Sequence, residues 1–187
     1  MSSVKKKLKQ ELHEQIIDPL DDKEIRDYLP DAKILTYNQL ENIRKIEELL
    51  PNDKSYFFLL YLDSPNSGHW TVLSRYKNTI EFYCSYGSKP DAPLLWLSYP
   101  TRVELKTNIP YLTKLLNDAT NRFKVVYNPI QYQSKINSVA TCGRHGLYRI
   151  KCLLQKNLTL EKYYTHTNRL KRSGLTNDEI VSLMVFN

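Results

Sequence analysis

The first fifty residues carry apolar side chains at helical spacing. Val4, Leu8, Leu12 and Ile16 stand four residues apart, with lysines and glutamates between them, which is the pattern of an amphipathic helix. Shorter helices are predicted around residues 22–28 and over residues 38–50, where apolar residues recur every three or four positions. We therefore expect residues 1–50 to form a helical N-terminal segment.

The pattern changes in the next part of the chain. Residues 56–62 form a nearly continuous apolar and aromatic run that is too short for a good helix and is typical of a strand buried on both faces. Two further strands are predicted, over residues 69–76 and 79–84. Only Lys77 and Asn78 separate them, a spacing that suits a tight hairpin.

Helical patterns return after this hairpin. A helix over residues 111–120 and a strand over residues 123–127 are followed by a long helix that starts at Cys142. Gly143 and Gly146 are poor helix formers, and their presence in this helix indicates close packing against another backbone. A capping-box sequence at Thr176–Glu179 predicts a last helix.

This order of elements predicts an α+β fold with a central, mostly antiparallel sheet flanked by helices. With 187 residues, 41% of them hydrophobic, the chain suits one domain, 1–187. Within it we expect the helical segment 1–50, a core over 55–155 and C-terminal helices over 156–187. We also expect a monomer.

Composition argues against a membrane segment, a disulfide framework and a metal site. No apolar stretch approaches the roughly 18 residues that span a bilayer, and the basic start runs into Gln10 and Glu11 instead of an apolar signal core. We therefore expect no membrane association. The three cysteines, Cys84, Cys142 and Cys152, have no paired spacing, so neither a disulfide framework nor a bound metal is expected.

The net charge of +7 favours an acidic surface or a polyanion as a partner. The alternative is that the charge only aids solubility. Two basic segments are the candidate nucleic-acid contacts, unless they are merely solvated helix faces. Their members are Lys5, Lys6, Lys7, Lys9, Arg169, Lys171 and Arg172.

The context of Cys142 points to chemistry. Cys152 lies among apolar residues and has the sequence context of a buried core thiol. Cys142 instead opens a helix. The unpaired amides at such a position stabilise a thiolate and can bind an oxyanion.

A nucleophilic thiol needs a base, and the chain has four histidines. His13 lies on a charged helix, His166 lies in a polar segment, and His145 is fixed on the same helix as Cys142. His69 follows a glycine-containing loop at the start of a strand, a junction that holds an imidazole rigidly. His69 is therefore the candidate base.

These residues also occur in a recognisable order. Gly68-His69-Trp70 opens a strand, the returning strand ends in residues 81–87 (EFYCSYG), a glutamine follows, and Thr141-Cys142-Gly143-Arg144-His145 opens a helix. This order resembles the adenain and SUMO-protease class of cysteine proteases, especially the maturation proteases of virophages and Maverick/Polinton elements. The resemblance covers about residues 56–154 and implies a papain-like core with the nucleophile at a helix N-terminus.

The resemblance assigns roles to individual residues. It makes Cys142 the nucleophile and His69 the general base. The glutamine of the class, which donates to the oxyanion, corresponds to Gln133, with Gln131 as the alternative. Substrates of the class carry small residues near the cut, which implies a narrow groove with Trp70 in its wall.

The third catalytic position departs from the class. An acid or an asparagine is usual there, but this chain has Cys84. If Lys77 and Asn78 form the turn, Glu81 opposes Ser74 and lies on the sheet face away from His69. Asp91 in the following loop, a backbone carbonyl or a water could orient the imidazole instead, or the enzyme could work as a Cys-His dyad.

The resemblance therefore implies a cysteine endopeptidase that processes capsid and other virion precursor proteins during maturation and uses no cofactor. It also implies a location in the virion and in the virus factory of the host cytoplasm. The basic charge, and not the resemblance, makes genomic DNA a further candidate partner. Two alternatives remain: an isopeptidase that removes SUMO-like or ubiquitin-like modifiers, and a non-catalytic basic virion protein that binds nucleic acid.

Overall fold

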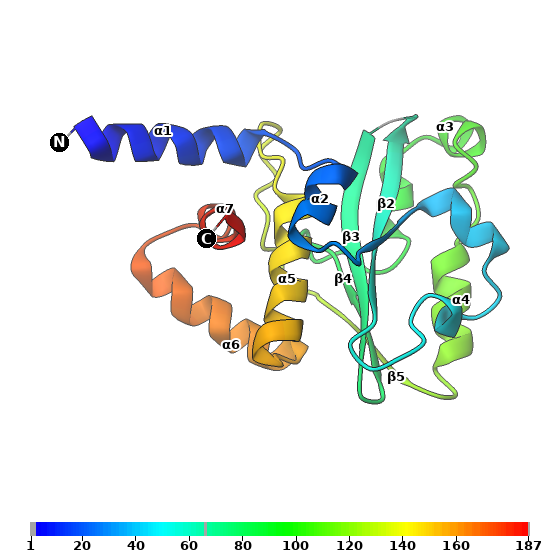
Figure 1. Ribbon diagram of the computed structural model, residues 1–187. Coiled ribbons are helices and arrows are strands. Elements are labelled where there is room, and N and C mark those ends of the chain that lie inside the picture. The colour runs from blue at the N-terminus through cyan, green and yellow to red at the C-terminus, as the bar shows by residue number, and fades with distance from the viewer. Residues whose placement is uncertain (1–2, 66, 187) are drawn as a thin grey trace.

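A five-stranded sheet with helices on both faces forms the centre of the molecule (Figure 1). The computed structural model describes residues 3–65 and 67–186, with the side chains of residues 3–6, 8 and 186 left out. The strands follow one another across the sheet in chain order: β1 (Lys33–Thr36), β2 (Tyr56–Ser64), β3 (Ser67–Tyr76), β4 (Thr79–Tyr83) and β5 (Lys124–Tyr127).

The predicted α+β class is confirmed. The three central strands are antiparallel, whereas the edge strands β1 and β5 pair in parallel with β2 and β4. In the hairpin, Tyr76 faces Thr79 and Ser74 faces Glu81, so the predicted register is confirmed. Strand β1 was not predicted, because four residues are too few to show a periodic pattern.

The helices differ from the prediction mainly in the N-terminal part. The predicted helix over residues 38–50 is wrong, because only two short 3-10 turns form there. The Glu48 carboxylate accepts hydrogen bonds from the backbone amides of Arg44 (3.0 Å) and Lys45 (2.9 Å), and at Ile43 the chain is extended. The helices and 3-10 turns are α1 (Ser3–Ile17), α2 (Asp22–Tyr28), η1 (Tyr37–Asn42), η2 (Ile46–Glu48), η3 (Ala92–Trp96), α3 (Tyr99–Glu104), α4 (Tyr111–Ala119), α5 (Cys142–Lys156), α6 (Leu160–Leu170), η4 (Lys171–Ser173) and α7 (Asn177–Phe186).

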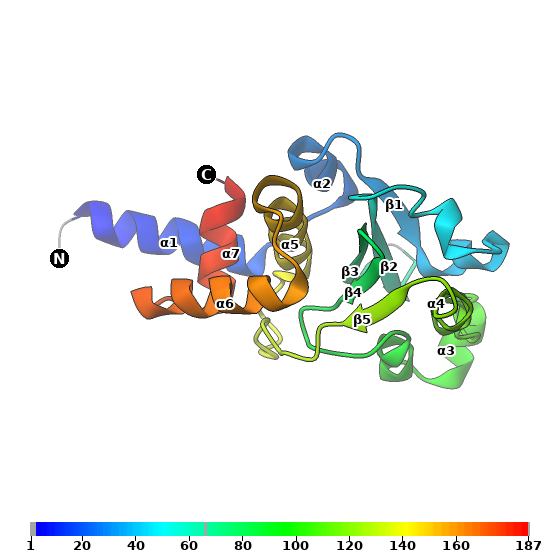
Figure 2. The same cartoon turned by 90° about the horizontal axis from the view of Figure 1, so that it is seen from below.

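Two apolar cores lie on opposite faces of the sheet. One lies under α5, α6 and α7, and the other lies under η1, η2 and α4, as the two views in Figures 1 and 2 show. Helix α5 runs closely along β3: a Cβ at Gly146 would come 2.9 Å from Val72 and 3.0 Å from Phe58. The glycines of this helix therefore do mark close packing, but against side chains and not, as the sequence had indicated, against another backbone.

A buried ion pair joins the sheet to α5. The guanidinium of Arg149 donates two hydrogen bonds, of 2.6 and 2.7 Å, to the carboxylate of Glu81, and both side chains are completely buried. A third hydrogen bond runs from Arg149 to the Leu158 carbonyl (3.0 Å). This cluster fixes the rotation of α5 against β4.

The two chain ends pack on the same side of the sheet. Helix α7 lies against both α5 and α1, so the C-terminal helix covers the start of the helix that carries Cys142 (Figure 2). None of the described helices is both long and apolar enough to cross a membrane.

Candidate active site

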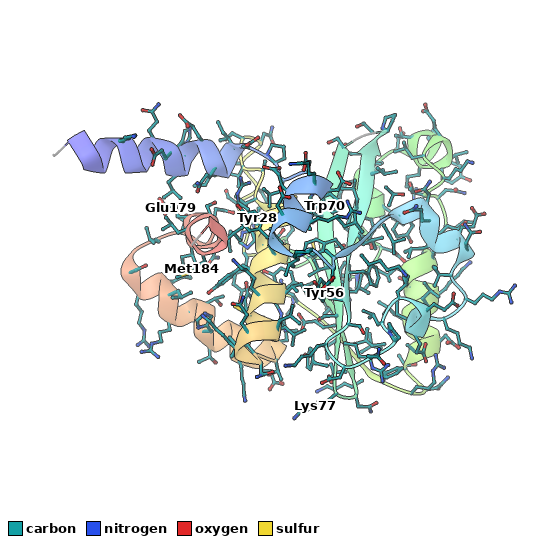
Figure 3. The ribbon with its side chains drawn as sticks, in the orientation of Figure 1. Tyr28, Tyr56, Trp70, Lys77, Glu179 and Met184 are labelled. Atoms are coloured by element: carbon teal, nitrogen blue, oxygen red, sulfur yellow. The ribbon has the colours of Figure 1, made fainter. Side chains whose placement is uncertain are left out.

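His69 lies at the end of the hairpin opposite its turn, which Lys77 marks in Figure 3. The strand can begin here because Gly68 has no side chain: a Cβ would overlap the carbonyl oxygen of Tyr61. The His69 ring stacks on Tyr86 at a centroid distance of 4.9 Å and meets the edge of Trp96 at 5.2 Å. These contacts fix the plane of the imidazole.

The environment of His69 keeps the ring neutral. Burial, followed by repulsion from His145, lowers the pKa of His69 from 6.5 to about 3. Its Nε2 atom lies 3.3 Å from the sulfur of Cys84. A neutral imidazole is the form that can accept a proton, but a pKa this low also makes the ring a weak base until a charge or substrate changes its surroundings.

Cys142 is the first residue of α5, and it lines the same cleft as His69. It is 9% exposed. Burial raises the pKa of its thiol, although hydrogen bonds from the backbone of Trp70 and Gly143 act in the opposite direction. The sequence suggested that the helix start would stabilise a thiolate; the structure shows that desolvation outweighs this effect.

Gln133 is brought to this cleft and Gln131 is not among its lining residues. The side-chain oxygen of Gln133 accepts a hydrogen bond from the Ser85 hydroxyl (2.7 Å), and its nitrogen donates to the Val139 carbonyl (3.1 Å). These two contacts fix the orientation of the amide. Gln131 is exposed and donates to the Gln133 carbonyl (3.1 Å).

Cys84 sits directly after β4, beside the His69 ring. Burial raises the pKa of its thiol. Hydrogen bonds from the backbone of Ser88, Tyr86 and Gly87, and from the Ser88 side chain, act in the opposite direction. A group that accepts from so many donors occupies a place that suits an anion.

Asp91 does not reach His69, which corrects one sequence-based expectation. Its carboxylate accepts hydrogen bonds from the hydroxyls of Tyr37 (2.7 Å) and Tyr61 (3.3 Å) and from the backbone amide of Thr113 (2.8 Å). It therefore ties the loop after β4 to η1 and α4. Asp91 lies in an irregular loop, and its partners are distant in the sequence, so no sequence pattern indicated them.

Trp70 does not form the wall of the groove either. Side chains alternate along β3, so Trp70 points to the face opposite His69, where it is 7% exposed within the core under α5 (Figure 3). Its indole donates to the Leu20 carbonyl (2.9 Å). Trp96, which is 52% exposed, lines the cleft instead.

Sequence reasoning gave Tyr86 and Trp96 no role. Both line the cleft beside His69. Tyr86 belonged to the quoted segment after the returning strand, so its position was visible in the sequence. Trp96 lies in a proline-punctuated stretch without periodicity, and no sequence signal indicated that it would lie against His69.

The basic segments lie away from this cleft. Lys7 and Lys9 on α1 are exposed, as are Arg169, Lys171 and Arg172 at the end of α6 and in η4. The side chains of Lys5 and Lys6 lie outside the described residues. The two segments extend from the end of the molecule that is remote from the sheet (Figure 1).

One cleft of this mixed α+β fold therefore holds a thiol at a helix start, a neutral imidazole and an amide of fixed orientation. No family model matches the sequence. The chain is 31% identical over 155 residues, 82% of its length, to the uncharacterized protein V9 of Sputnik virophage, 85% of which is covered. It therefore belongs to the same protein family as V9.

A search of solved structures found the selenomethionine ASFV pS273R protease. The two folds superpose with a TM-score of 0.47 and 15% sequence identity, over 90% of this chain and 67% of that chain. A likeness of this degree leaves the activity of the present protein to be argued from its own cleft.

Proposed function

We propose that the protein is a cysteine endopeptidase that processes virion precursor proteins. The observation that carries the proposal is the convergence of Cys142, His69 and Gln133 on one cleft from three separate parts of the chain. Three features support these roles: backbone amides at the start of α5 act on the Cys142 thiol, the His69 ring is neutral and the Gln133 amide has a fixed orientation.

In the proposed reaction, the Cys142 thiol gives its proton to His69 as the sulfur attacks the carbonyl carbon of the scissile bond. Nε2 of His69 faces Cys84, which leaves Nδ1 to receive this proton. The negative charge that forms on the carbonyl oxygen is stabilised by the Gln133 side-chain N–H and the Cys142 backbone N–H.

The imidazolium then protonates the leaving amine, and the carbon–nitrogen bond breaks to give a thioester. Water, deprotonated by His69, attacks the thioester and releases the acid and the free thiol. Because both Cys142 and His69 are neutral before substrate binds, proton transfer accompanies attack in this scheme.

The test is cleavage of a peptide library by the purified protein, read by mass spectrometry. We expect wild type and Cys152→Ala to cleave and Cys142→Ala to be inactive. Cys152 is the matched control, because it is a buried thiol on the same helix. Cleavage by Cys142→Ala would overturn the proposal, and cleavage of isopeptide-linked ubiquitin-like conjugates alone would favour a deconjugating enzyme.

A further inference from the structure

A carboxylate outside the proposed catalytic set holds the segment that connects Gln133 to Cys142. Asp178, near the start of α7, is 6% exposed. Its Oδ1 accepts a hydrogen bond from the Thr141 hydroxyl (2.5 Å), and its Oδ2 accepts from the backbone amide of Ser134 (3.0 Å). One side chain from the C-terminal helix therefore binds both ends of this segment.

His145 completes the cluster. Its Nε2 atom lies 3.0 Å from Oδ1 of Asp178, and because an ionised carboxylate only accepts, Nε2 is the donor. Burial acts to raise the pKa of Asp178, but hydrogen bonds from His145, Thr141 and Ser134 outweigh it and hold the pKa below its usual range. The carboxylate is therefore charged at neutral pH.

The segment depends on such external contacts because it has no regular structure of its own. Residues 134–140 are irregular apart from one turn at residues 137–138, and residues 135–138 are exposed. Besides Asp178, two further hydrogen bonds from the described residues hold it: the Gln133 side chain donates to the Val139 carbonyl (3.1 Å), and the Ile16 carbonyl accepts from the Ala140 amide (2.8 Å). Asp178 is the charged member of this set.

Asp178 also accepts the hydrogen bond that the Thr141 hydroxyl donates. Threonine directly before a helix usually accepts a hydrogen bond from an amide of the first turn. Here the Thr141 side chain makes no such cap, and its hydroxyl is turned toward Asp178, to which it donates. The amides of Cys142 and Gly143 act on the Cys142 thiol instead, and they are the donors that an oxyanion at this helix start would use.

We propose that Asp178 is a positioning residue for the proposed peptidase: it holds Thr141 away from the α5 amides and fixes the loop that carries Gln133. This inference rests on the proposed function for its catalytic part. The C-terminal helix is then a component of the active site, although the sequence resemblance stopped before it.

The kinetic test compares Asp178→Ala with Ser182→Ala on a cleaved peptide. Ser182 lies one turn further along α7, is fully buried and has no hydrogen-bond partner for its hydroxyl among the described residues. In Asp178→Ala we expect kcat to fall about 10- to 100-fold with KM within about threefold, because transition-state donors are displaced. Ser182→Ala should match wild type.

Conservative variants separate positioning from general stability. Thr141→Val removes one hydrogen bond to Asp178 and should lower kcat, whereas Thr141→Ser keeps the hydroxyl and should restore it. The double variant of Thr141→Val with Asp178→Ala should be no worse than Asp178→Ala alone, since the two residues act through one contact.

Hydrogen exchange provides a readout that does not need peptidase activity. In folded Asp178→Ala, the Ser134 amide should exchange at least about tenfold faster than in Ser182→Ala, because its acceptor is gone. Unchanged exchange together with wild-type kcat in Asp178→Ala would overturn the inference, as would an equal kcat loss in Ser182→Ala. If wild type cleaves no peptide, the proposed function fails while the exchange result still tests the positioning.

Discussion

Two buried pairs of titratable side chains, each with one member on the β3–β4 hairpin, are built in opposite ways. Glu81 and Arg149 are fully buried, charged and joined by two short hydrogen bonds. His69 and Cys84 are also buried, yet the ring is neutral and the pKa of the Cys84 thiol is raised. The first pair is sealed under α5, whereas the second lies beside an open cleft.

The comparison shows that the buried Glu81–Arg149 pair holds the fold together, whereas burial controls protonation at the His69–Cys84 pair. A charge buried with a complete set of partners has no reason to exchange protons, and removal of one partner is costly. A buried imidazole whose polar neighbours are neutral can take up a proton when a reaction supplies one.

The largest effect is expected at the sealed pair. Glu81→Gln leaves the Arg149 guanidinium buried without a charged partner, and should lower the free energy of unfolding by about 3–5 kcal/mol. Urea denaturation followed by circular dichroism measures this change. Replacing both residues, as Glu81→Gln with Arg149→Met, should recover part of the loss because no charge then stays buried.

A partly exposed pair is the matched control for that experiment. Arg122 and Glu47 are 35% and 28% exposed and lie 2.5 Å apart. Glu47→Gln should cost no more than about 1 kcal/mol. An equal cost at both pairs would show that burial of the Glu81 site is not what makes it important.

The second prediction concerns pH and His69. Its folded pKa is about 3, against an ordinary value of 6.5, so between these values the unfolded chain binds a proton that the folded protein does not. Stability is therefore fully present above pH 6.5 and falls as the pH is lowered. At pH 4.5 the loss from this residue should be about 2–3 kcal/mol.

Urea denaturation of wild type and His69→Phe at pH 7.5 and pH 4.5 measures that loss. The variant keeps a ring but has no titratable group at this position, so its stability should depend less on pH by the predicted amount. Tyr86, Cys84, Cys142 and His145 surround or influence the ring and are the same in both proteins. If the free energy of unfolding changed with pH by the same amount in both proteins, the His69 imidazole would not be held neutral by burial.

The third prediction concerns Asp91, a buried carboxylate that resembles Glu81 more than it resembles Cys84. Its partners are the Tyr37 and Tyr61 hydroxyls and the Thr113 amide. Asp91→Asn should lower stability by about 1–2 kcal/mol, since one donor loses its acceptor. The kcat for peptide cleavage should stay unchanged, and a fall in kcat without a fall in stability would return Asp91 to the role of orienting acid.

Much of the fold could be predicted from periodicity alone. The β3–β4 hairpin with its register, the start of α5 at Cys142 and α4 all followed from local spacing. Strand β1 and the 3-10 turns η1 and η2 could not be predicted, because β1 depends on pairing with β2 and each turn on the hydrogen bonds of one side chain, Gln39 in η1 and Glu48 in η2. Such contacts leave no repeat in the sequence.

The candidate site was predictable where local context defines a role. Cys142 at a helix start and His69 at a strand start carry that context in their neighbours. Trp70 was misplaced although strand alternation already put it on the opposite face from His69. Trp96 and Asp178 reach the site from distant segments, and only the folded chain shows that they do.

The smallest effect is expected at Cys84, where a single substitution to aspartate would turn the neutral His69–Cys84 pair into an ion pair like that of Glu81 and Arg149. In Cys84→Asp the carboxylate would accept from the same donors that now surround the sulfur, including the backbone of Tyr86 and Ser88. A negative charge beside His69 raises the pKa of the imidazole. Peptide cleavage should stay equal or rise a few-fold, and the stability loss between pH 6.5 and 4.5 should shrink because the ring can now be charged in the folded state.

Cys84→Ala separates a supporting thiol from a reacting one. It removes the contact to Nε2 of His69 but leaves the stacking on Tyr86 and the edge contact with Trp96, so the ring keeps its plane and cleavage should fall only a few-fold. Measured rates for the Ala and Asp variants, compared with Cys142→Ala, decide between the two roles. If Cys84→Ala were as inactive as Cys142→Ala, the Cys84 sulfur would itself take part in the reaction. The His69–Cys84 pair would then be two reacting groups, and not a base with a supporting thiol.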